Sequence, residues 1–208
     1  MATTMGRSGP AVLEASRASL PPDATAHVVN LWGSEVLLFR RLDRREHDRR
    51  RGACAGRLDA IGHLETLMAL PVDLPVPLRS LEPELRKKIR MLPAGAVELD
   101  RRQVTRRAVR PMRPELAVVK AAGWRDGLEK AGRFAPVCRR AMLLEREPGG
   151  LDELLIEASY YGIGVLVPRD GGLEMAGAPE GFRPARHTAA AWLPVEEIYQ
   201  RIDGAQSA

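Results

Sequence analysis

The stretch LAVVKAAGWRDGLEKAGRFAPVCRRAMLL (residues 116–144) decides the fold class of this 208-residue chain. It begins with a nearly continuous apolar run up to Lys120, which is typical of a central strand covered on both faces. Apolar residues from Trp124 to Ala135 then recur at helical spacing. A second short apolar run, RAMLLE (140–145), follows, so the stretch predicts a strand, a crossover helix and a parallel strand.

The same alternation continues toward the C-terminus. LDELLIEASYY (151–161) carries an apolar helical stripe, and IGVLV (163–167) has the composition of a buried strand. Gly162 between them is suited to the left-handed conformation that ends many helices. We therefore expect Tyr160 and Tyr161 to be packing residues at a helix end rather than a platform on which bases stack.

On the N-terminal side, PELRKKIRML begins with a proline suited to the first turn of a helix and predicts a helix over 84–92. Three short segments follow at 96–100, 103–109 and 115–121, and their separation by arginine pairs and prolines predicts a three-strand meander. Near the C-terminus, PVEEIYQRI (194–202) predicts a closing helix that begins at its proline.

The first 80 residues give weaker signals. Residues 1–26 show no sustained period and predict a flexible tail. Residues 27–80 read as an N-terminal subdomain ending in a proline-rich connector, and 81–208 as the main α/β domain. HVVNLWGSEVLLF (27–39) fits one or two strands and nearly as well a helix. The arginine-rich run 40–57 favours a solvent-facing helix with pairs of opposite charge over a surface that binds phosphates.

Composition limits the functional classes. The net charge is +5 and the pI about 9.7, which mildly favours a polyanionic partner, although an arginine-, alanine- and glycine-rich chain is also typical of a GC-rich genome. The two cysteines, Cys54 and Cys138, are too few for a disulfide framework and lack zinc-site spacing. No apolar run is long enough to span a bilayer. We expect a soluble cytoplasmic protein without a cofactor.

The order of elements over residues 82–167, together with LAVVKAAGWRDGLEKAGRFAPVCRRAMLL and YYGIGVLV, resembles the core of the PD-(D/E)XK nuclease-like superfamily. The resemblance implies an α/β, restriction-endonuclease-like core of helix, three-strand meander, helix, strand, helix and strand. It also implies a divalent metal held by an acid on the second strand and an acid-x-lysine on the third. Lys120 matches the lysine, but Val118 stands at the acid position, and Thr105, Arg106 and Arg107 occupy the second strand. The resemblance therefore implies a degenerate metal site.

Three functions follow from these residues. The first is a non-catalytic, nucleic-acid-associated protein, or a subunit of a DNA-processing complex. The second is a winged-helix transcriptional regulator over residues 57–113, with ELRKKIRML as recognition helix and AVELDRRQVTRRAV as wing. The third is a nuclease in which Asp100 and Glu115 substitute as ligands of Mg or Mn and Lys120, beside the metal, helps to bear the developing negative charge. A protein partner or a second copy of the chain also stays open. The expected nucleic-acid contacts are Arg101, Arg102, Arg106, Arg107, Arg110, Arg113, Lys120 and Arg125.

Overall fold

The computed structural model describes residues 4–17, 20–169, 172–183 and 187–206, which form two compact units. The large-sheet unit comprises Met1–Arg41 and Pro114–Pro184, and the small-sheet unit comprises Leu42–Arg113 and Ala185–Ala208. This division differs from the boundary near residue 80 that the prolines suggested. The reason is that the proline-rich segment is no linker: Pro75–Pro77 forms an edge strand, a position where the lost N–H of proline does little harm.

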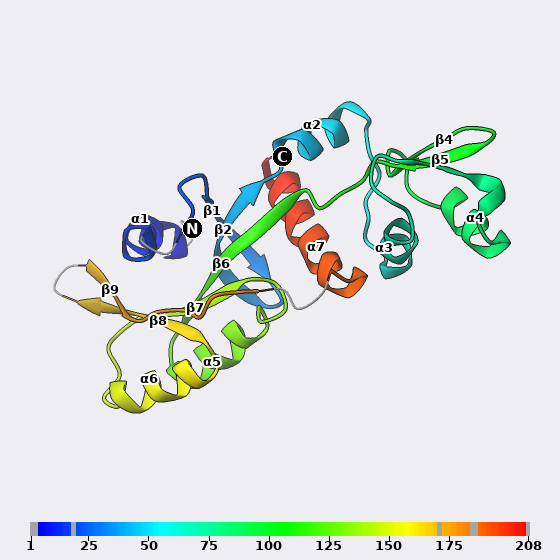
Figure 1. The fold of residues 1–208 in the computed structure, drawn as a ribbon. Helices are drawn as coiled ribbons and strands as arrows, with labels where there is room; N and C mark the ends of the chain where they lie inside the picture. The colour runs from blue at the N-terminus through cyan, green and yellow to red at the C-terminus, as the bar shows by residue number, and fades with distance from the viewer. Residues whose placement is uncertain (1–3, 18–19, 170–171, 184–186, 207–208) are drawn as a thin grey trace. The chain divides into compact units, whose positions relative to one another are not determined.

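The large-sheet unit is built on one six-stranded sheet with the order β1-β2-β6-β7-β8-β9 (Figure 1). Strands β6, β7 and β8 are parallel, and β9 pairs antiparallel with β8 at one edge. The strand, helix, strand prediction for the deciding stretch is therefore confirmed, and an α/β fold is established. The bounds are β1 Thr25–Leu31, β2 Ser34–Leu42, β6 Met112–Ala121, α5 Trp124–Gly132, β7 Arg139–Leu144, α6 Leu151–Tyr160, β8 Ile163–Arg169 and β9 Gly172–Gly177.

Helices cover both faces of this sheet. Helix α1, Thr4–Ser16, packs on one face, where Val12 is fully buried in a cluster with Leu116, Val118 and Leu143. Helices α5 and α6 lie on the other face (Figure 1). The expectation of a flexible tail over residues 1–26 is thus wrong for Thr4–Ser16, because this segment contains an apolar residue that the core of the sheet buries.

The two readings of residues 27–39 are resolved in favour of strands. β1 and β2 pair antiparallel, with Leu31 opposite Ser34. The two residues of the turn, Trp32 and Gly33, both have positive φ, at 48° and 78°. Such a two-residue turn matches the twist of a hairpin, and Gly33 adopts this conformation without a steric penalty.

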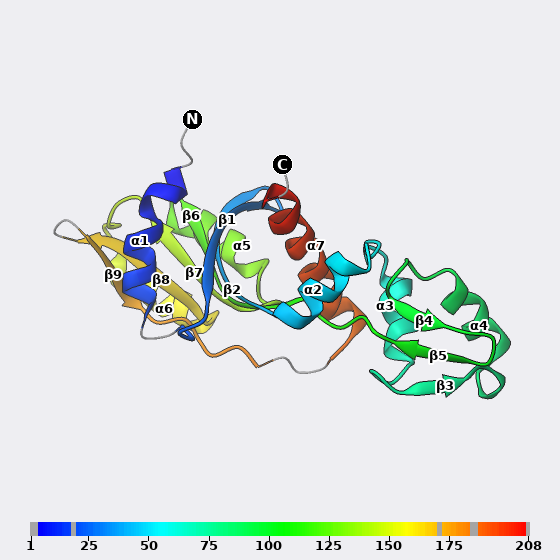
Figure 2. The ribbon, with the colours of Figure 1, turned by 90° about the horizontal axis from the view of Figure 1, so that it is seen from above.

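The described residues of the small-sheet unit form four α-helices and a three-stranded antiparallel sheet of order β3-β5-β4 (Figure 2). The three-strand meander expected over 96–121 does not form: β4 and β5 pair, but β6 lies between β2 and β7. β6 is buried almost throughout, so it needs a sheet covered on both faces. The bounds are α2 Arg44–Gly52, α3 Ile61–Met68, β3 Pro75–Pro77, η2 Leu78–Ser80, α4 Pro83–Arg90, β4 Val97–Leu99, β5 Gln103–Arg106 and α7 Ala189–Gln206.

One of two predicted helix ends differs from expectation. Helix α7 begins at Ala189 rather than at Pro194, because the alanines before the proline are strong helix formers. Helix α6 ends as predicted, with Gly162 at φ +65°. Tyr160, however, is 83% exposed and Tyr161 48% exposed, so the expectation that they pack against the core is wrong. No helix within the described part of the chain is both long and apolar enough to cross a membrane.

Candidate nucleic-acid interface

Helix α4 presents a basic surface to solvent. Pro83 opens the helix, and its apolar side turns inward through Ile89, which packs with Leu70 and Val104 in the core of the small-sheet unit. Lys87 and Lys88 are exposed on the other side of the helix. The helix carries four basic residues and one acid, and none of its basic side chains forms an ion pair within the described residues.

The hairpin of β4 and β5 carries a second basic group. At its turn, Asp100 accepts hydrogen bonds from the backbone N–H groups of Arg102, at 2.6 Å, and Gln103, at 2.9 Å. These bonds lower the pKa of Asp100, so the carboxylate that fixes the turn stays ionised. Arg101 and Arg102 are consequently held at an exposed hairpin tip.

Arg106, at the end of β5, connects the hairpin to helix α3. Its guanidinium donates hydrogen bonds to the carbonyls of Leu67 at 3.0 Å, Leu70 at 3.2 Å and Ala108 at 3.0 Å. It also stacks over the ring of Trp192, 5.1 Å from the centroid. Burial lowers the pKa of Arg106. This arginine holds the hairpin to α3, and its Nε and Nη1 donors are not available for a phosphate.

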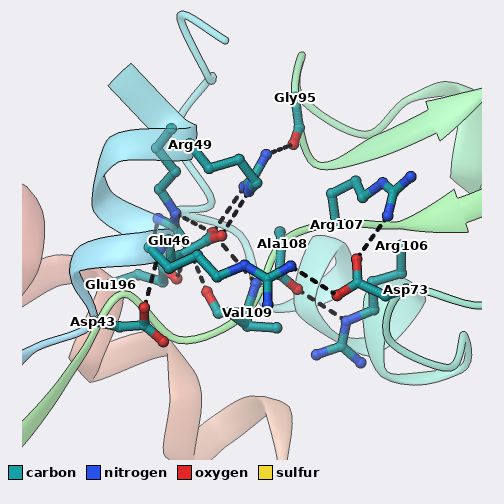
Figure 3. Close-up of polar contacts among 12 residues, drawn as sticks. Asp43, Glu46, Arg49, Asp73, Gly95, Arg106, Arg107, Ala108, Val109 and Glu196 are labelled. Atoms are coloured by element: carbon teal, nitrogen blue, oxygen red, sulfur yellow. Dashed lines mark hydrogen bonds and ion pairs between the residues drawn. The ribbon is translucent and has the colours of Figure 1, made fainter. Parts of the chain in front are cut away.

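Arg107 is neutralised by two acids. It donates to Asp73 at 2.8 Å, as Figure 3 shows, and to Glu98 at 2.7 Å. Hydrogen bonds to Glu98 and Asp73 raise the pKa of Arg107, and the same bonds lower the pKa of each carboxyl group. Arg107 therefore ties the start of β3 to the hairpin instead of adding to a positive surface.

A buried ionic cluster stabilises the unit (Figure 3). Glu46 on α2 is 3% exposed and accepts from Arg49 at 2.6 Å and from Arg50 at 2.6 Å. Arg50 reaches Glu196 of α7 with two bonds of 2.7 and 2.9 Å, and it also donates to the carbonyl of Val109 at 2.8 Å. Burial alone lowers the pKa of Arg50, but the bonds to Glu196 and Glu46 prevail and raise it. The arginine-rich run does form a helix with opposite-charge pairs, but one face is buried, which corrects the solvent-facing interpretation.

The other expected contacts are dispersed. Arg110 is half-buried and Arg113 is exposed, both in the small-sheet unit. Lys120 and Arg125 lie in the large-sheet unit, where Lys120 pairs with Glu145 at 2.8 Å and Arg125 lies over the ring of Trp124. The eight residues expected from the sequence thus do not belong to a single unit.

The three residues of the nuclease alternative also have other roles. Asp100 fixes a hairpin turn, and Glu115 is buried and accepts a hydrogen bond from Arg41 at 2.8 Å. Glu115 and Lys120 are five residues apart on β6, so their side chains lie on opposite faces of the sheet. Within the ranges that the structure describes, no three His, Cys, Asp or Glu side chains are grouped closely enough to hold a metal ion.

Comparison with protein-family models, curated proteins and solved structures gave no match. The site is therefore defined by geometry alone. Its exposed basic residues on α4, Lys87, Lys88 and Arg90, were absent from the contacts expected under the first function, although the winged-helix alternative placed them on its recognition helix. No clear signal for them was present in the sequence, because Glu84 lies three residues before Lys87 and four before Lys88, a spacing that suggests ion pairs on the helix.

Proposed function

We propose that the small-sheet unit is a winged-helix DNA-binding module. The observation that carries this proposal is its topology: α3, β3, α4, β4 and β5 follow in that order, and the sheet order is β3-β5-β4. In a winged helix, the first strand likewise pairs with the last, and the last two strands form the wing. The winged-helix alternative of the sequence is accordingly the one that the geometry favours.

Helix α4 then serves as the recognition helix. Its exposed Lys87 and Lys88 suit the major groove, whose base edges and phosphates accept hydrogen bonds from such side chains. Arg101 and Arg102 at the hairpin tip suit phosphates of the neighbouring backbone. One departure from the pattern affects the mode of binding: only the three-residue turn η2 stands between β3 and α4, where a full helix is usual. We therefore expect α4 and the wing to carry most of the contacts.

Fluorescence anisotropy with a mixed-sequence duplex tests the proposal. The wild-type protein is expected to bind at low salt, with an affinity that falls steeply as salt rises. Lys87→Ala combined with Lys88→Ala should reduce the slope of log K against log salt by about 2, since each lost phosphate contact removes about 0.9. Arg101→Ala combined with Arg102→Ala should act similarly.

Lys130→Ala is the matched control. Lys130 lies on α5 of the large-sheet unit and pairs with Asp126 at 2.7 Å, so its loss should leave DNA binding unchanged. The proposal is wrong if the wild-type protein binds no duplex at low salt, or if the control weakens binding as much as the α4 variant does.

We further propose that the nuclease-like resemblance belongs to another set of segments. The order α1, β1, β2, β6, α5, β7 supplies a helix, three strands, a helix and a parallel strand, and β1-β2-β6-β7 are neighbours in one sheet. Lys120 remains near the end of the third of these strands, paired with Glu145. This supports a degenerate, non-catalytic scaffold. Incubation of plasmid DNA with Mg or Mn should give no cutting, and cutting that Lys120→Ala abolishes would contradict the proposal.

A further inference from the structure

We propose that the small-sheet unit binds a small organic anion in a hollow where Arg110 supplies the cationic side chain. The hollow has a volume of about 390 Å³, and the residues that line it are Asp43, Met68, Arg106, Val109, Arg110, His187 and Trp192. That volume falls within the range of small-molecule sites in proteins. The inference does not depend on DNA binding, because the hollow is defined by residues outside α4 and the hairpin tip.

Arg110 differs from Arg50 and Arg106, which lie in the same unit. Arg50 and Arg106 are each satisfied by carboxylates or carbonyls. Arg110 has no hydrogen bond or ion pair with any of the residues that the structure describes. Burial lowers its pKa, and the opposing electrostatic effect of Glu196 is the smaller one. A half-buried guanidinium without a partner costs free energy, which a bound anion would recover.

The remaining walls favour an anion with an apolar body. Met68 and Val109 supply apolar surface, whereas Trp192 also lines the hollow but is only 2% exposed. The carboxylate of Asp43 also lines the hollow, but one of its oxygens already accepts the backbone N–H of Glu46 at 3.0 Å. The two positive charges of Arg106 and Arg110 outnumber the negative charge of Asp43, so the net charge of the lining is positive. An aromatic or branched carboxylate fits this combination better than a DNA phosphate, which could not use the apolar walls.

The binding test compares three probes by isothermal titration calorimetry on the full chain. Benzoate is expected to bind, its neutral isostere benzamide at least tenfold more weakly, and inorganic phosphate more weakly than benzoate. Arg110→Gln should reduce benzoate affinity at least tenfold. Arg79→Gln is the control, because Arg79 is exposed in the same unit and does not line the hollow. Equal binding of benzoate and benzamide, or no binding of benzoate, overturns the inference.

A second measurement needs no ligand. Arg110→Met removes an uncompensated charge from a half-buried position, so it is expected to raise Tm by about 2–4 °C. A fall in Tm would show that Arg110 has a structural partner and would overturn the inference. A third outcome also contradicts the inference: benzoate does not bind the wild-type protein, and Arg110→Gln weakens duplex binding as much as the α4 double variant does. Arg110 would then be a DNA contact.

Discussion

Glu196→Ala is expected to destabilise the small-sheet unit more than any surface substitution. Glu196 is fully buried on α7 and accepts three hydrogen bonds. Two come from Arg50, at 2.7 and 2.9 Å, and one comes from the indole N–H of Trp192, at 2.7 Å. The side chain of Arg50 is only 10% exposed, so water cannot replace the carboxylate that the substitution removes. A buried cation and a buried indole donor would both lose their partner.

The cost can be estimated from these contacts. Removing one partner of a buried ion pair costs about 3–5 kcal/mol. Because Arg50 keeps its bond to Glu46, we expect the lower end, about 3 kcal/mol in the free energy of unfolding. Urea denaturation followed by tryptophan fluorescence measures this loss, since Trp192 lies beside the substituted residue.

Glu197→Ala is the matched control for that measurement. Glu197 is the next residue on the same helix, and its pair with Arg201 spans 3.2 Å between side chains that are 40% and 52% exposed. Such exposed pairs contribute only about 0.2–1 kcal/mol. The reasoning is refuted if both substitutions cost the same small amount, because the buried cluster would then not hold α2 to α7.

Two further predictions concern glycine and cysteine residues. Gly127→Ala on α5 should lower the free energy of unfolding, measured by urea denaturation, by about 1–3 kcal/mol, because the new Cβ would lie 2.7 Å from the sulfur of Met142. Gly132→Ala on the same helix is the control. Its Cβ would meet no atom within 4 Å, so the substitution should not destabilise the protein. Burial raises the pKa of Cys138 to about 12, so at pH 8 a thiol reagent should modify only the exposed Cys54 in the native chain and both cysteines after denaturation. Reaction of two thiols in the native chain would contradict this.

The alternating segments from Leu116 to Val167 could be predicted because their signals are local. Each strand is a short apolar run bounded by glycine or proline, and each helix carries a continuous apolar stripe. Parallel strands also require crossover helices, so the order of elements fixed the pairing of β6, β7 and β8. Local pattern and long-range pairing agree in this part of the chain.

The meander could not be predicted because strand order along the chain is not strand order in the sheet. β6 pairs beside β2, although α2, α3, α4 and the whole small sheet lie between them in sequence. No local pattern marks where a chain leaves one sheet and returns to it seventy residues later. The domain boundary predicted at the proline-rich segment differs from the structure for a related reason. Pro75 and Pro77 suggest a linker when only neighbouring residues are considered, but prolines are also compatible with an edge strand.

Charge pairs at the candidate site also could not be predicted from the sequence, because the partners are far apart along the chain. Arg107 counted as a surface charge in the sequence because Asp73, the acid that binds it, lies 34 residues away. Arg50 is neutralised by Glu196, which is 146 residues away. Net charge therefore says little about where a polyanion binds, because long-range acids cancel many of the arginines. On α4 and at the hairpin tip, neighbouring basic side chains are exposed together and no described acid pairs with them, so these cations can release their counterions to a phosphate backbone.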